Sequence, residues 1–165
     1  MAERVACAFF WRRPLVGVLE LGASPEAVGV ARQYVRASLG EWACPFGVRE
    51  DMELICSELV SNAVQATRSL QALPLAESWP VGLRLFGNRQ RVLLEVWDCH
   101  PGVPVRRVAP DEAEGGRGLA IVHELADHWG SRRLTARVKA VWAELLLPAP
   151  TVHPGETIQE KGGAR

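Results

Sequence analysis

The chain has 165 residues, of which 48% are hydrophobic and 23% are charged, and its 19 basic and 19 acidic side chains balance. This length and composition are typical of a single soluble globular domain with its own core. Because the net charge is zero, we expect neither nucleic acid nor a membrane surface as a direct partner.

Cysteine usage indicates a reducing compartment. None of the four cysteines forms a C-x-x-C pair, which argues against a zinc ribbon and a thioredoxin-like motif: Cys7, Cys44, Cys56 and Cys99. The apolar N-terminal stretch is interrupted by arginines and lacks a signal-peptide cleavage pattern. We therefore expect a cytoplasmic protein.

The first half of the chain predicts strand followed by two helices. Residues 5–21 are typical of a strand or a strand pair. Ser24 and Pro25 fit the N-cap and first position of a helix that should end near Gly40. Helical spacing of apolar residues then predicts the longest helix over 48–70.

The second half predicts a hairpin, a loop, a helix and a last strand. Alternating residues indicate strands at 81–87 and 91–98, joined by the short turn "GNRQ". A Pro- and Gly-rich loop occupies about 99–116, and a helix over 117–130 should stop at its final glycine. An apolar strand follows at 139–148.

This order of elements predicts an α+β fold, a two-layer sandwich with the helices on one side of the sheet. We expect residues 1–148 to form one domain. Residues 149–165 carry proline, glycine and charge without periodicity, which is typical of a flexible C-terminal tail.

Two polar residues stand on the longest predicted helix. Glu58 and Asn62 are four positions apart and share one face, close to the apolar positions Leu54, Ile55 and Leu59. One interpretation is a boundary pair that hydrogen-bonds locally. The other is that both face a cavity, where the amide oxygen suits Mg²⁺ and the carboxylate can act as a general base.

A lone acid, Asp98, ends a predicted strand in "WDCHPGVPV". A tight turn, a metal site and a ligand-binding carboxylate are all compatible with this stretch. Adjacent Cys99 and His100 lack the usual spacing of zinc ligands, although clustering with His123 or His128 remains open.

A glycine turn opens the next predicted helix in "EGGRGLAIV". Backbone N–H groups at such a turn can bind an anion, and Arg117 could contact a phosphate. The alternative is a flexible loop that is capped by glycine and binds no ligand. The turn follows a long loop and lacks G-K-[ST], so it is neither a Rossmann fingerprint nor a P-loop.

Taken in order, the three motifs resemble the GHKL (Bergerat-fold) ATPase/kinase superfamily, which includes gyrase B and the histidine kinases. Within it, the chain is most similar to the stand-alone anti-sigma-factor serine/threonine kinases. The resemblance covers roughly residues 20–147 and rests on "SELVSNAVQAT", "VWDCHPGVPV", "EGGRGLAIVHELADHWG" and "KAVWAEL". It implies helices on one face of a mixed, mostly antiparallel sheet.

The resemblance also implies roles for matching residues. Glu58 corresponds to the general base, Asn62 to the magnesium ligand, and Asp98 to the acid that accepts a hydrogen bond from the adenine amino group. Segment 103–115 corresponds to a lid over the nucleotide. The other positions at which the resemblance implies nucleotide binding are Gly102, Gly116, Arg117, Gly118, Leu119 and Lys139.

Two positions depart from the family pattern. His100 stands in place of the first glycine of D-x-G-x-G, and the final turn has no glycine between Thr135 and Trp142, so that Thr135 and Lys139 would replace part of its function.

The resemblance implies an ATP- and Mg²⁺-dependent protein serine/threonine kinase. Such a kinase would phosphorylate an anti-sigma-factor antagonist, bind a sigma factor by partner switching, and could form a homodimer. Because of the two departures, the alternative is a nucleotide-binding adaptor with little catalysis.

Overall fold

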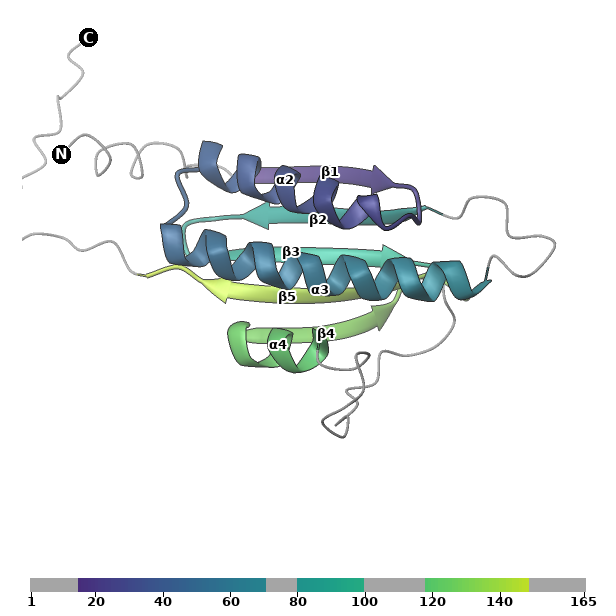
Figure 1. The fold of residues 1–165 in the computed structure, drawn as a ribbon. Coiled ribbons are helices and arrows are strands. Elements are labelled where there is room, and N and C mark those ends of the chain that lie inside the picture. Colours follow the sequence, from purple (N-terminus) through teal and green to yellow (C-terminus); the bar gives the residue numbers. More distant parts are fainter. Residues whose placement is uncertain (1–14, 71–79, 100–117, 149–165) are drawn as a thin grey trace, which may run out of the picture.

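The computed structural model describes residues 15–70, 80–99 and 118–148 of the chain. Figure 1 shows the strands and helices of this described part in chain order: β1 (Leu15–Leu21), α2 (Glu26–Glu41), α3 (Phe46–Leu70), β2 (Val81–Gly87), β3 (Arg91–Asp98), α4 (Gly118–Leu125), β4 (His128–Arg133) and β5 (Lys139–Leu146). The expected tail over 149–165 lies outside the described residues.

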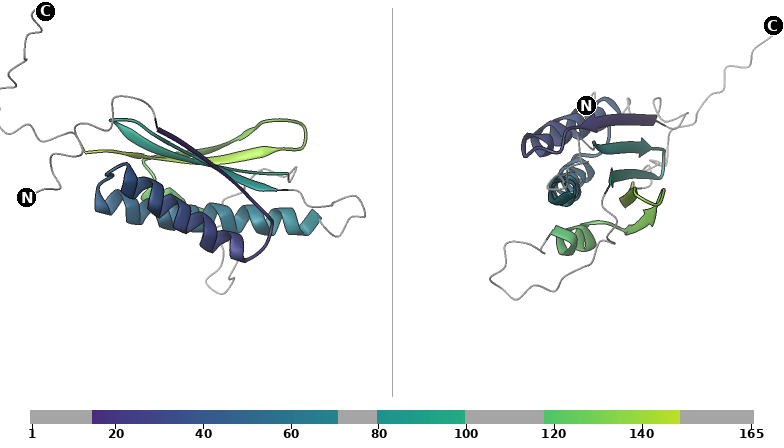
Figure 2. Two further views of the ribbon diagram at one scale, coloured as in Figure 1. Left: turned by 90° about the horizontal axis from the view of Figure 1, so that it is seen from above. Right: turned by 90° about the vertical axis from the view of Figure 1, so that its right-hand side faces the viewer.

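The strands form one sheet in the order β1-β2-β3-β5-β4, and every pairing among these described strands is antiparallel. The helices lie together on one face of this sheet (Figure 2). The predicted α+β two-layer sandwich is therefore confirmed. No helix in the described part of the chain is long and apolar enough to cross a membrane.

The core lies between the two layers. Alternate residues of the central strands point into it, among them Leu83 and Leu85 of β2 and Leu94 and Val96 of β3. From the helical layer, α3 buries an apolar face: Met52, Ile55, Cys56, Leu59, Val60, Ala63 and Val64. Apolar residues that repeat every two positions in the strands and every 3.6 positions in the helix thus pack against each other in one core.

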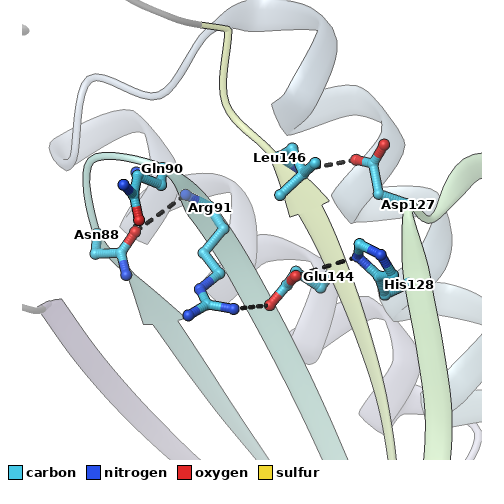
Figure 3. Close-up of polar contacts among 7 residues, drawn as sticks. All are labelled: Asn88, Gln90, Arg91, Asp127, His128, Glu144 and Leu146. Atoms are coloured by element: carbon cyan, nitrogen blue, oxygen red, sulfur yellow. Dashed lines mark hydrogen bonds and ion pairs between the residues drawn. The ribbon is translucent and has the colours of Figure 1, made fainter.

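The predicted helix over 117–130 is wrong in its second half. Helix α4 ends at Leu125, and His128–Arg133 forms strand β4 along β5. The backbone N–H of Asp127 donates to the carbonyl of Glu144 at 3.0 Å, and the Asp127 carboxylate accepts from the N–H of Leu146 at 2.7 Å (Figure 3). Pairing with a distant strand therefore overrides the local apolar pattern.

The N-terminal elements also differ in detail from the prediction. Strand β1 covers only Leu15–Leu21, and residues 5–14 lie outside the described part. Helix α2 has Pro25, and not Ser24, at its N-cap, without a side-chain capping hydrogen bond. The helix start still follows the expected Ser-Pro pair within one residue.

Two acidic side chains on the sheet face opposite the helices are largely buried and form ion pairs. Glu144 accepts from Arg91 Nη1 at 2.9 Å and contacts His128 Nδ1 at 3.3 Å (Figure 3). Glu95 is held between two further cations, Arg84 and Arg132. Because burial of a charge is costly without a partner, we interpret both acids as structural.

Candidate nucleotide-binding site

Two of the sequence motifs meet where α3 and α4 pack together. Glu58 and Asn62 stand on the side of α3 that faces Gly118, the first residue of α4. A Cβ atom at Gly118 would lie 2.5 Å from Glu58 Oε2 and 3.4 Å from Asn62 Nδ2. Only a residue without a side chain fits here while Glu58 keeps its position.

Glu58 and Asn62 lie at the margin of the core-facing stripe of α3. Ile55 and Leu59 are fully buried, but Leu54 is 44% exposed, which corrects the expectation that it belongs to that stripe. Glu58 is half-buried and Asn62 is exposed. Both polar groups are therefore accessible at the edge of the helical layer, where a ligand can reach them.

Asp98 forms the second part of the site. It ends β3 with its side chain on the inner face, in alternation with Leu94 and Val96, and the residue is only 2% exposed. In the antiparallel ladder its partner is Lys139, the first residue of β5. Lys139 Nζ donates to Asp98 Oδ1 at 2.7 Å.

The sequence indicated both residues of this ion pair, but not their contact. Asp98 and Lys139 lie 41 positions apart, and only the register of β3 with β5 places them opposite each other. Their side chains are 3% and 12% exposed, respectively. A carboxylate and an ammonium thus lie side by side on the inner face of the sheet, where β3 ends and β5 begins.

Helix α3 connects the two parts of the site. It packs on β3 and on α4, and its C-terminal half runs toward the end of β3 that carries Asp98 (Figure 1). Helix α3, which carries Glu58 and Asn62, therefore packs on the strand that ends in Asp98.

The two histidines that the metal hypothesis grouped with Cys99, His123 and His128, contact other side chains. His123 Nδ1 accepts from Trp129 Nε1 at 3.2 Å, and His128 contacts Glu144. Burial first, and the charge of Asp98 second, raise the pKa of the Cys99 thiol. Residues 15–70, 80–99 and 118–148 contain no group of three potential His, Cys, Asp or Glu metal ligands, and His100 lies outside them.

Other expected site residues divide into two groups. Leu119 is described and is buried in the core at 8% exposure, so its side chain packs within the protein. Thr135 uses its hydroxyl oxygen within the β4–β5 turn, where it accepts from the N–H groups of Arg137 and Val138. The following lie outside the described residues: Gly102, the lid segment 103–115, Gly116 and Arg117.

The donor set fits a nucleotide with a magnesium ion. Asn62 offers a hard amide oxygen one helical turn from the Glu58 carboxylate, and the missing side chain of Gly118 lets α4 approach both residues closely. Mg²⁺ commonly takes only one or two protein ligands and completes its shell with phosphate oxygens and water. The absence of a larger acidic cluster among the described residues is compatible with such a site.

Comparisons with known proteins agree with this geometry. Residues 21–145 match the family described as histidine kinase-like ATPase domain. A comparison with curated proteins gives no significant match.

Among solved structures, the chain is similar to the RsbU and RsbW domains of Rv1364c from Mycobacterium tuberculosis, with a TM-score of 0.54 and 22% identity. The match covers 86% of this chain but only 35% of that one, so it supports the fold alone. With three-quarters of its length matched, the chain belongs to the histidine kinase-like ATPase domain family.

Proposed function

We propose that this protein is an ATP- and Mg²⁺-dependent protein serine/threonine kinase that phosphorylates an anti-sigma-factor antagonist. The observation that carries the proposal is the close packing of Gly118, the first residue of α4, on Glu58 and Asn62 of α3. In this proposal Glu58 is the general base and Asn62 is the oxygen ligand for magnesium, one turn apart on the same helix.

Each residue of the site has a distinct role in this proposal. Asp98 accepts a hydrogen bond from the adenine amino group, and Lys139 lies beside it. At the other end, Asn62 holds magnesium. Backbone groups of Gly118 and Leu119 at the start of α4 bind phosphate, together with residues from the preceding segment: Gly102, Gly116 and Arg117.

Glu58 performs the proton transfer. ATP would supply the phosphoryl group, and a magnesium ion held by Asn62 would offset the negative charge of the phosphates. As the serine or threonine oxygen of the substrate bonds to the γ-phosphorus and the bond to ADP breaks, the Glu58 carboxylate takes the hydroxyl proton. Its half-buried position leaves it accessible to such a hydroxyl.

The partners in this proposal come from the resemblance of the motifs to anti-sigma-factor kinases. The solved structure with a similar fold contains RsbU and RsbW domains, and the partner-switching context belongs to the proposal. In that context the chain binds a sigma factor in one state and phosphorylates the antagonist in the other. We place this cycle in the cytoplasm, with the protein as a homodimer.

Calorimetric titration with ATP and Mg²⁺, followed by phosphoryl transfer to purified antagonist proteins, tests the proposal. Glu58→Gln should slow transfer about 10²–10⁴-fold while ATP still binds. The matched control is Glu50→Gln, which changes an exposed acid of the same helix. Unchanged transfer in Glu58→Gln excludes Glu58 as the base, and absence of ATP binding by the wild type refutes the nucleotide site.

A second function, a nucleotide-binding adaptor, is favoured by one feature of the described structure. The β4–β5 connection is a tight turn, closed by the N–H of Leu134 donating to the carbonyl of Val138 at 2.8 Å, and it contains no glycine. It therefore lacks a glycine-rich loop that could close over a nucleotide. ATP binding without transfer to any antagonist would support this alternative.

A further inference from the structure

The ion pair between Asp98 and Lys139 places a hydrogen-bond acceptor next to a hydrogen-bond donor. The carboxylate only accepts, whereas the ammonium only donates and carries three N–H groups. The two are fixed side by side because Asp98 and Lys139 are direct partners in the β3–β5 ladder, with 2.7 Å between Nζ and Oδ1. Both side chains are largely buried.

Adenine and guanine differ at position 6 of the purine ring. Adenine has an amino group there, which donates, and guanine has a carbonyl oxygen, which accepts. A carboxylate alone therefore binds the adenine edge and repels the guanine oxygen. An ammonium beside the carboxylate removes that repulsion, because it donates to the oxygen while an amino group can still donate to the carboxylate.

We propose that Lys139 is a specificity-determining residue that, together with Asp98, lets the nucleotide site bind both adenine and guanine nucleotides. This inference rests on the proposed function only in that the purine base lies at Asp98. In either complex the base keeps one orientation, and its position-6 group selects the partner: Asp98 for the amino group and Lys139 for the carbonyl oxygen.

The position of Lys139 favours this role over that of a distant surface charge. The residue begins β5, and its side chain emerges on the inner face next to the core positions Val141 and Ala143. At 12% side-chain exposure, its ammonium is held near Asp98 and has little access to bulk water. The cation therefore remains beside the carboxylate when a base approaches.

The test is calorimetric titration of the full chain with MgATP and with MgGTP. For the wild type we expect dissociation constants within about tenfold of each other, because each base keeps one charge-assisted hydrogen bond. Lys139→Met should shift the ratio toward ATP by roughly 10- to 100-fold, the value of one hydrogen bond to a charged group. ATP affinity should change less than GTP affinity.

Arg137→Met is the matched control, because Arg137 is an exposed cation of the same turn whose backbone N–H, and not its side chain, bonds to Thr135. It should leave the ratio unchanged. Lys139→Gln, whose amide can still donate to Asp98, provides a second variant if Lys139→Met does not fold. It should shift the ratio in the same direction by a smaller factor.

The outcomes separate this inference from the proposed function. Binding of ATP by the wild type with GTP more than about 100-fold weaker, or equal losses of both nucleotides in the Lys139 variants, overturns the role of Lys139 and leaves the kinase proposal intact. Binding of neither nucleotide by the wild type overturns both.

Discussion

Replacing Lys139 with methionine removes the cation from the buried carboxylate of Asp98, and we expect a large loss of stability. The Asp98 side chain is 3% exposed, so its carboxylate is poorly solvated when no ligand is bound. Removing one partner of a buried ion pair costs about 3–5 kcal/mol. The unfolding free energy of Lys139→Met should fall by this amount.

The reverse change should be milder. In Asp98→Ala the ammonium of Lys139 remains, but its long aliphatic stem lets it move toward solvent, where 12% of the side chain is already exposed. We therefore expect a cost below about 3 kcal/mol. The double variant Asp98→Ala/Lys139→Met removes both charges and should be more stable than the sum of the single losses indicates.

Urea unfolding followed by circular dichroism measures these differences. The denaturant slope should be the same in all variants, so that midpoints report stability. Arg36→Ala is the control, because it breaks the exposed Arg36–Glu53 bridge, and it should shift the midpoint less. Additive losses in the double variant, or a Lys139→Met variant as stable as the wild type, would refute the view of a coupled buried pair.

Three further substitutions test other parts of the structure. Gly118→Ala places a Cβ 2.5 Å from Glu58 Oε2; the flexible carboxylate can move away, so single-turnover phosphoryl transfer should fall on the order of 10²-fold at an almost unchanged urea midpoint. Gly82→Ala places a Cβ 2.1 Å from the ring of Trp97 and should cost about 1–3 kcal/mol in urea unfolding, unless the indole moves without strain. Burial raises the pKa of Cys56 from 9.0 to about 12. The unfolded chain thus loses this proton first, and at pH 10 the wild type should lose roughly 1.4 kcal/mol of stability relative to pH 8, measured against the same difference in Cys56→Ala.

Local patterns predicted the central elements well. Alternation over 81–87 and 91–98, with a short polar turn between them, gave the bounds of β2 and β3 as the structure has them. In that turn, Asn88 Oδ1 accepts from the N–H groups of Gln90 and Arg91, so its geometry is encoded by neighbouring residues (Figure 3). Elements that depend on neighbouring residues are predictable from the sequence.

Strand β4 shows why other parts were not predictable. Its sequence, "HWGSRR", has no apolar alternation, and most of its residues are exposed. It is a strand because β5 offers an edge for pairing, and the carbonyl of Glu144 engages the backbone just before it. The Asp98–Lys139 contact depends on the same kind of information, the register between strands far apart in the chain.

For a related reason, only part of the candidate site could be predicted from the sequence. The spacing of Glu58 and Asn62 defines their common helix face, but not which element covers it. Helix α4 begins with Gly118 against this face, and this contact is part of the tertiary structure. Resemblance to a family supplied the expectation that these motifs meet, and the role of each residue in binding or catalysis stays a prediction.

The two ends of the proposed site are held by different kinds of structure, and this makes binding and transfer separable. Asp98 and Lys139 sit in the strand ladder next to the core, so changes there should alter stability and base binding together. Glu58 and Asn62 stand at an accessible helix margin, where a change of side chain removes little buried surface. Glu58→Gln should therefore keep the fold and bind ATP while losing transfer. A partner that responds equally to this variant and to the wild type would be regulated by nucleotide-dependent conformation, and one that responds only to the wild type would require phosphorylation.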